Sequence, residues 1–194
     1  MVVLIVLAAA VAVLAVVLVA NAARLKPTPV LDPLPPSAAA GDDAAVERFR
    51  ALLRIPTVWD LRNPDADRTA FDGFVPALRR LYPAVFEACE LELIDGRGIS
   101  LLWKGANREL APIVLMAHHD VVDADPVGWT HDPFAADIDD GRIYARGAVD
   151  TKCVWAGLME AAERLIAEGF TPPRDVYFFS SNTEEDGGDT APHM

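Results

Sequence analysis

Three short stretches of the sequence place imidazole and carboxylate groups where they could act together. In the first stretch, His118 and Asp120 are two residues apart, so both side chains lie on the same face of an extended strand end. A carboxylate in that position can orient an imidazole and make it a better metal ligand. By itself, this spacing is also typical of a hydrogen-bonded surface pair. His119 points to the opposite face, and we expect it to be structural or exposed.

The second stretch, GRIYARGAVDTK, leaves Asp150 at the expected start of a helix. A helix N-terminus stabilises negative charge and keeps this carboxylate ionised, although Asp150 could simply cap the helix. The third stretch, SSNTEEDGGD, follows a buried strand and contains Glu184 and Glu185. Adjacent carboxylates can divide the work, one binding a metal while the other accepts a proton. The alternative is a solvated acidic loop.

Taken together, the three stretches predict a metal site. They offer nitrogen and oxygen donors, and the two cysteines of the chain are too few for a thiolate zinc site. Imidazole and carboxylate donors suit Zn²⁺ and, less specifically, Mn²⁺ or Co²⁺. An aspartate that bridges two ions ~3.5–4 Å apart would form the centre of a two-metal hydrolase.

The spacing of apolar residues predicts an α/β fold that positions these stretches. Helical spacing follows Asp42 or Asp43, either of which can cap the helix, and ends near Arg54. It recurs over 69–82 and 151–168. Strands are expected over 91–94, 100–104, 113–116 and 175–180, and Asp95-Gly96 is a turn signal between the first two. We expect a mixed or parallel sheet flanked by helices. Each stretch then lies beyond the carboxyl end of a strand or in a loop entering a helix, where open α/β sheets bind ligands.

The net charge of −12 argues against a nucleic-acid-binding protein, since phosphate contacts need clustered Lys and Arg. Residues 1–20 are apolar throughout and long enough to cross a membrane as a helix. No second run of this kind exists in the sequence, which excludes a polytopic membrane protein. We divide the chain into a transmembrane anchor or signal segment (1–22), a Pro-rich linker (23–42) and a catalytic domain (43–194).

Two features of the N-terminal segment point in opposite directions. Ala20-Asn21-Ala22 fits a signal cleavage site, whereas the length of the run and its lack of a basic start fit a retained helix. We expect a membrane-anchored protein with an extracytoplasmic domain. Secretion after cleavage is the alternative.

Four motifs occur in the order and spacing of a known family: MAHHDVV, GW-x-x-DPF at 128–134, GRIYARGAVDTK, and the Glu pair before Gly187-Gly188. They resemble the co-catalytic zinc peptidases and deacylases, which include carboxypeptidase S, glutamate carboxypeptidase, aminoacylase and acetylornithine deacetylase. The resemblance covers about residues 43–188, and FRALLRIPTV resembles the family's first helix and turn. The apolar start and DVVDADPVGW look most like the carboxypeptidase S branch.

The resemblance implies a role for each candidate residue. His118 corresponds to a ligand of one zinc ion, Asp120 to the catalytic carboxylate that orients it, and Asp150 to the bridge between two ions. Glu184 corresponds to the general base and Glu185 to a ligand of the second ion. The implied reaction is cleavage of an amide bond adjacent to a free carboxylate, by a metal-activated water, in a peptide or an N-acyl amino acid.

Family members also have a further acidic ligand, a late histidine and a lid domain that often forms the dimer. The sequence shows none of these after Glu185, and we do not expect His193 to be a ligand. We therefore interpret residues 43–194 as the N-terminal part of such a catalytic domain, with dimerisation unlikely. Two alternatives stay open: an N-acyl amino acid deacylase of the same family, and a catalytically inert truncated fragment.

Overall fold

The computed structural model describes residues 2–24, 42–63, 68–188 and 190–193, and of residues 191 and 192 only the backbone. The chain forms two compact units, residues 1–41 and 42–194. Most of the expected Pro-rich linker, residues 25–41, lies outside the described residues.

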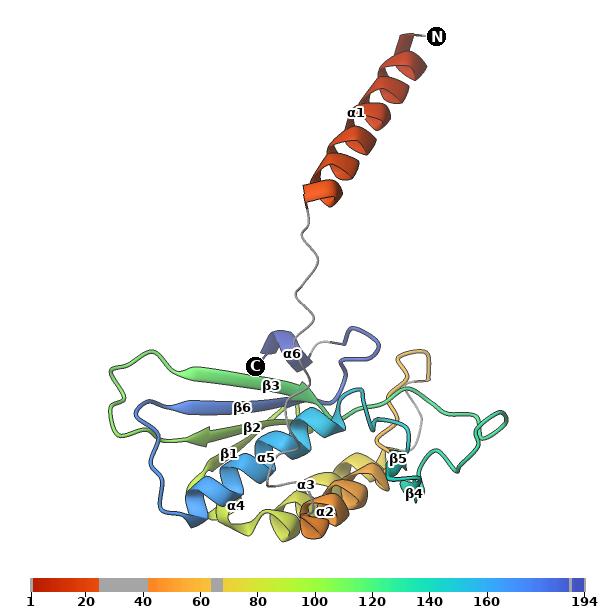
Figure 1. Cartoon of the computed structure of the whole chain (residues 1–194). Coiled ribbons are helices and arrows are strands. Elements are labelled where there is room, and N and C mark those ends of the chain that lie inside the picture. Colours follow the sequence, from red (N-terminus) through yellow and green to blue (C-terminus); the bar gives the residue numbers. More distant parts are fainter. Residues whose placement is uncertain (1, 25–41, 64–67, 189, 194) are drawn as a thin grey trace. The chain divides into compact units, whose positions relative to one another are not determined.

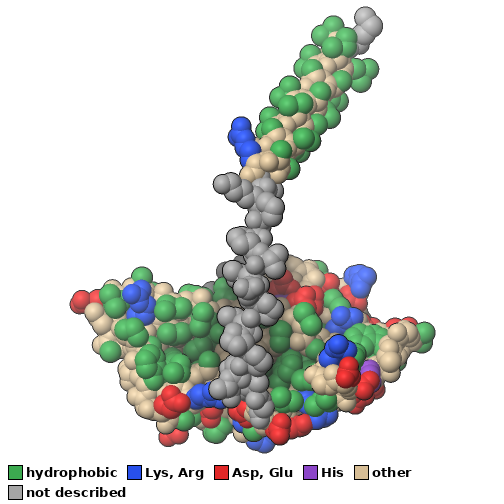
Figure 2. All heavy atoms as spheres, in the orientation of Figure 1, with side chains coloured by type: hydrophobic (Ala, Val, Ile, Leu, Met, Phe, Trp, Pro, Cys, Tyr) green, Lys and Arg blue, Asp and Glu red, His purple; other side chains and the backbone are tan. Residues whose placement is uncertain are grey.

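The first unit contains one helix, α1 (Val2–Arg24), of 23 residues. Hydrophobic side chains line the visible length of this helix (Figure 2). Its mean hydropathy of 3.5 and its length are sufficient for a membrane span. A signal sequence has the same properties, so the helix leaves both alternatives open.

The second unit is built on a four-stranded mixed sheet in the order β1-β2-β6-β3 (Figure 1). Its strands are β1 (Glu90–Ile94), β2 (Gly98–Trp103), β3 (Ile113–His118) and β6 (Val176–Ser181). Strand β2 is antiparallel to both β1 and β6, whereas β3 and β6 are parallel. Of the two predicted arrangements, the mixed sheet is therefore the one observed.

The turn between β1 and β2 is the one that Asp95-Gly96 predicts. Both residues have positive φ, 50° for Asp95 and 83° for Gly96. They are the central residues of a turn closed by the hydrogen bond from Arg97 N–H to Ile94 O, at 3.2 Å, and Asp-Gly is a preferred sequence for a hairpin turn with φ > 0 at both central positions.

Helices α2 (Asp43–Leu53), α3 (Thr69–Leu81), α4 (Pro83–Ala88) and α5 (Lys152–Ala167) contribute to a single core on one face of the sheet (Figure 1). Alternate strand residues face this core, because successive side chains of a strand point to opposite faces. The buried side chains include Leu52, Phe74, Leu78, Ile99, Leu101, Trp155, Met159 and Phe178.

Helix α2 begins as its sequence predicts, because the side chain of Asp42 accepts a hydrogen bond from Ala45 N–H. Helix α4 was not predicted: it has six residues, too few for a periodic pattern, although Pro83 at its first turn is a typical helix start. The short hairpin of β4 (Asp137–Asp139) and β5 (Arg142–Tyr144) and the terminal turn α6 (Thr190–His193) complete the unit.

The other face of the sheet carries the remaining apolar side chains of β3 and β6. Val114 and Met116 are 48% and 55% exposed. They lie opposite Tyr177 and Phe179 in the register of the parallel pair. His118, two residues beyond Met116, belongs to this same face of β3.

Candidate metal centre

The candidate residues come from the end of strand β3 and from two loops that meet at one end of the sheet. Strands β3 and β6 are parallel neighbours, with Ala117 paired to Ser180 and His118 paired to Ser181. Their carboxyl ends therefore lie together, and the segments after them bring Glu184 and Glu185 close to His118. Asp150 reaches the same place from the loop that precedes α5.

One imidazole and two carboxylates form a compact group. One ligand atom each from His118, Asp150 and Glu185 lies within 4.8 Å of the others. His118 Nε2 is 3.1 Å from Asp150 Oδ1 and 3.4 Å from an oxygen of Glu184. Zinc binds nitrogen and carboxylate oxygen at ~2.0–2.2 Å, so small side-chain movements would bring three donors onto one ion.

Asp120 orients the ring of His118 through contacts at Nδ1. The main-chain oxygen of Asp120 lies 3.0 Å from His118 Nδ1, and its carboxylate Oδ1 lies 3.4 Å from the same nitrogen. The other carboxylate oxygen accepts a hydrogen bond of 3.0 Å from the Glu185 N–H. With Nδ1 engaged by Asp120, Nε2 faces the other carboxylates, as a metal-bound histidine requires.

Two pKa shifts show that negative charge is concentrated here. Burial by itself lowers the pKa of His118, but the carboxylates of Asp120 and Asp150 outweigh it and raise this pKa to about 9. Burial also raises the pKa of Glu185, and the neighbouring carboxylates of Asp150, Asp120 and Glu184 add to this. Such a surplus of negative charge is what a bound cation would neutralise.

His119 lies on the other side of the strand, as expected, and it is buried rather than exposed. Its ring stacks on Phe74, with centroids 4.6 Å apart and 10° between the planes. Its Nδ1 lies 2.8 Å from Ser180 Oγ. Burial lowers its pKa to about 3, so this histidine is a neutral part of the core.

Asp150 does not cap α5, so the capping alternative for this residue is wrong. The N-cap of α5 is Thr151, and the side chain of Asp150 is 70% exposed. Lys152, at the first turn of α5, is fully buried. The carboxylate of Asp150 is therefore directed at His118 and solvent instead of at the helix.

Two threonines support the group, and neither has a role that was predicted from the sequence. Thr57 Oγ1 donates to the main-chain oxygen of His119, and Thr151 Oγ1 bonds with the main chain of His118. Their partners are 62 and 33 residues away and are main-chain atoms. No side-chain pattern in the sequence could identify such contacts.

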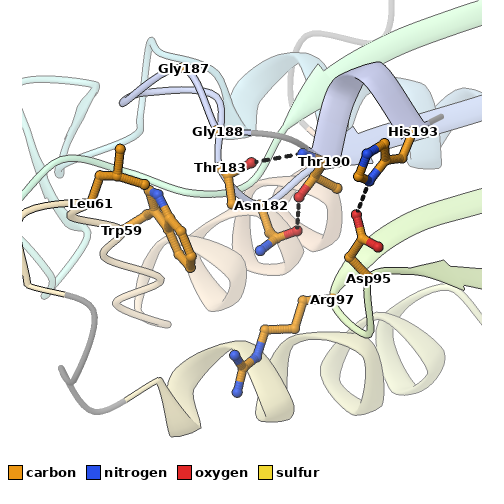
Figure 3. Close-up of a pocket in the computed structure, with 10 residues that line it drawn as sticks. All are labelled: Trp59, Leu61, Asp95, Arg97, Asn182, Thr183, Gly187, Gly188, Thr190 and His193. Carbon is orange, nitrogen blue, oxygen red and sulfur yellow. Dashed lines mark hydrogen bonds and ion pairs between the residues drawn. The ribbon is translucent and has the colours of Figure 1, made fainter.

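The cavity drawn in Figure 3 is lined by ten residues, and none of the candidate ligands is among them. It encloses about 440 Å³ between the β1–β2 turn, the segment of Trp59 and Leu61, and the loop after β6. His193 lies here, with Nδ1 2.5 Å from Asp95 Oδ2, and is not part of the metal-binding group found among the described residues. A smaller hollow of about 270 Å³ adjoins the candidate group and is lined by Met116, Ala117, His118, Thr151, Val154, Ser181 and Glu184.

Comparison with known proteins finds a matching family model and similar curated proteins. Residues 114–194 match Peptidase family M20/M25/M40. The chain is 35% identical over 148 residues to an uncharacterized carboxypeptidase of Schizosaccharomyces pombe, covering 73% of this chain and 25% of that protein. It is 35% identical over 147 residues to an N-fatty-acyl-amino acid synthase/hydrolase of Danio rerio, covering 74% of this chain and 28% of that protein.

The fold agrees with these matches. Human carnosine dipeptidase 1 superposes with a TM-score of 0.59 at 20% identity, over 76% of this chain and 33% of the dipeptidase. The chain spans between about a quarter and a third of the length of the curated relatives it matches. The predicted resemblance to peptidases and deacylases of this kind is thereby confirmed, with matches that cover part of each relative.

Proposed function

We propose that this chain contributes the metal centre of a hydrolase that cleaves an amide bond adjacent to a free carboxylate. Members of Peptidase family M20/M25/M40 are metal-dependent hydrolases, and this chain matches that family over residues 114–194. The observation that carries the proposal is the convergence of His118, Asp150 and Glu185 within 4.8 Å, from one strand end and two loops that are far apart in the sequence.

The donor set of this group fits a divalent cation. One imidazole nitrogen and two carboxylate oxygens are donors that suit Zn²⁺, and Co²⁺ or Mn²⁺ less specifically. The buried Oδ1 of Asp120 has no hydrogen-bond partner, and a positive charge on or beside His118 would compensate it. When bound, Zn²⁺ supplies a Lewis acid for the scissile carbonyl and lowers the pKa of water.

Each residue of the candidate group then has a task in binding or catalysis. His118, Asp150 and Glu185 would supply the metal ligands, and Asp120 keeps the imidazole of His118 in the orientation that binding requires. The largely exposed carboxylate of Glu184 lies at the rim of the group, 3.4 Å from His118 Nε2. There it can accept a proton from the attacking water and pass it to the leaving amine.

Two substrate classes share this chemistry. The S. pombe relative is called a carboxypeptidase and the D. rerio relative acts on N-fatty-acyl amino acids, and the chain is 35% identical to each. Both names describe an amide bond next to an amino acid that carries a free carboxylate. We place peptide cleavage first and N-acyl amino acid hydrolysis second. We further propose that α1 anchors the protein with its catalytic unit outside the cytoplasm, which its length and hydropathy support.

The proposal is tested by zinc content and turnover in the full-length gene product. Glu184→Gln should lower kcat ~10²–10⁴-fold with zinc content unchanged, because it removes a proton acceptor and leaves the ligands intact. Glu185→Gln should lower zinc content, because it removes a ligand. Glu109→Gln, in an exposed loop before β3, is the matched control and should change neither. Retention of more than a tenth of kcat in Glu184→Gln would contradict the assigned base, and absence of bound zinc in the wild type would contradict the proposed metal centre.

A further inference from the structure

The hydroxyl of Thr151 joins the loop of Asp150 to the strand of His118. His118 N–H donates to Thr151 Oγ1, and Thr151 Oγ1 donates to the main-chain oxygen of His118, each at 3.3 Å. The next residue, His119, donates its N–H to Ser181 O on β6, at 2.9 Å. Main-chain groups of a strand alternate in direction, so those of His118 face away from β6, and Thr151 satisfies them at the free edge of β3.

Helix capping does not explain this use of the side chain. Thr151 is the N-cap of α5, and its main-chain oxygen accepts bonds from Val154 N–H at 2.9 Å and Trp155 N–H at 3.3 Å. A threonine at this position ordinarily accepts a bond from the first turn through its hydroxyl. The hydroxyl of Thr151 makes no such bond to α5 and serves His118 instead.

The position of the Asp150 carboxylate depends on the backbone that Thr151 holds in place. The side chain of Asp150 is 70% exposed, so packing holds it weakly, and its position follows from the main chain at residues 150 and 151. On the far side of Thr151, Lys152 N–H bonds to Gly147 O at 3.1 Å and closes the loop. The two Thr151 bonds are thus the direct link between the backbone of Asp150 and that of His118.

We propose that Thr151 is a positioning residue for the cation, holding Asp150 and His118 at the separation that both need to bind one ion. This inference rests on the proposed function, because it takes His118, Asp150 and Glu185 as the ligands. Outer groups that fix metal ligands commonly contribute about 10–100-fold to metal affinity.

The test compares three variants of the full chain in detergent, with Zn²⁺ affinity measured by competition with a chromogenic chelator. Thr151→Val keeps the branched shape and removes the hydroxyl, so its Kd for Zn²⁺ should rise about tenfold. Thr151→Ser keeps the hydroxyl and should stay within about threefold of the wild type. Thr171→Val makes the same change at an exposed position beyond the other end of α5 and should have no effect.

Two further readouts separate positioning from folding. The visible absorption of bound Co²⁺ should change in Thr151→Val and be restored in Thr151→Ser, while the metal-free melting temperatures stay close together. If Thr151→Val does not fold, Thr151→Ala replaces it in the same comparison. The inference would be overturned if the wild type and the hydroxyl-free variant bound Zn²⁺ with equal affinity, or if Thr151→Ser weakened binding as much as Thr151→Val. Either result would leave the proposed metal centre unaffected. If Asp150→Asn binds Zn²⁺ as well as the wild type does, the proposed metal centre is wrong and the inference falls with it.

Discussion

Nζ of Lys152 lies 2.7 Å from the main-chain oxygen of Ile55 and 3.2 Å from that of Leu52. The first turn of α5 is thereby bound to the end of α2, where main-chain oxygens lack helical partners. Lys152 has no exposed surface, and it also lies over the ring of Phe74. The two bonds fix the start of the helix that follows Asp150.

Burial lowers the pKa of Lys152 from 10.5 to about 7. Between these values the unfolded chain binds more protons than the folded chain, so the Lys152 contribution to stability rises with pH by at most ~1.4 kcal/mol per unit. Below pH 7 the contribution is constant. In metal-free protein His118 acts in the opposite sense, because its pKa is raised to about 9 and its contribution is lost as pH rises from 6.5 to 9.

We therefore predict how the difference in unfolding free energy between the wild type and Lys152→Met changes with pH. Urea unfolding at pH 7 and pH 9.5 should show that the wild type gains stability relative to this variant as pH rises. Lys104→Met, at an exposed lysine of the domain, is the control and should show no comparable gain. If the difference in unfolding free energy between the two proteins does not vary with pH, the lowered pKa of Lys152 is contradicted.

We predict that the buried His119 makes the protein less stable in acid. Its pKa is lowered from 6.5 to about 3 by burial, so the folded state binds fewer protons in that range and stability falls as pH falls through it. His119→Gln does not titrate and should show a shallower decline between pH 6.5 and pH 4, by up to ~1.4 kcal/mol per unit. Urea unfolding at both pH values measures this. Parallel declines in the two proteins would show that His119 is not the group responsible.

The exposed face of the sheet predicts poor solubility. Val114 and Met116, on the edge strand β3, expose apolar surface beside Tyr177 and Phe179 of β6. We expect residues 43–194, produced alone, to be marginally stable, to associate, and to show no peptidase or deacylase activity with zinc added. Met116→Lys should reduce association measured by light scattering. Val127→Lys adds the same charge in an exposed loop, and an equal improvement there would show that net charge, not the sheet face, is the cause.

The N-terminal helix predicts retention in membranes. An uncleaved α1 should keep the protein in the membrane fraction after a carbonate wash, with the domain accessible to protease from outside. Val11→Lys places a charge at the middle of the helix, at a cost of about 3 kcal/mol, and should release protein, whereas Asn21→Lys near its end should not. Soluble protein beginning at Ala23 would show cleavage after Ala22 and contradict the anchor.

The local sequence determined the elements and the candidate residues. Apolar spacing placed α2, α3, α5 and the four sheet strands close to their observed positions. The Asp95-Gly96 turn, the Asp42 cap and the opposite orientations of His118 and His119 also followed from it. These features depend on residues within a few positions of one another, so the rules of helix and strand geometry are sufficient to predict them.

Only the tertiary structure decided how the candidate residues meet. The order β1-β2-β6-β3 puts His118 beside Ser181, which brings Glu184 and Glu185 to it from a segment more than sixty positions away. The roles of Thr151 and Lys152 likewise appear only in the folded chain, because their partners are main-chain oxygens or N–H groups of distant residues. Every residue carries such groups, so the sequence cannot mark them. Which of them meet is set by the packing of α2, α5 and the sheet around one core, where a hydroxyl or amine withdrawn from water must find a partner.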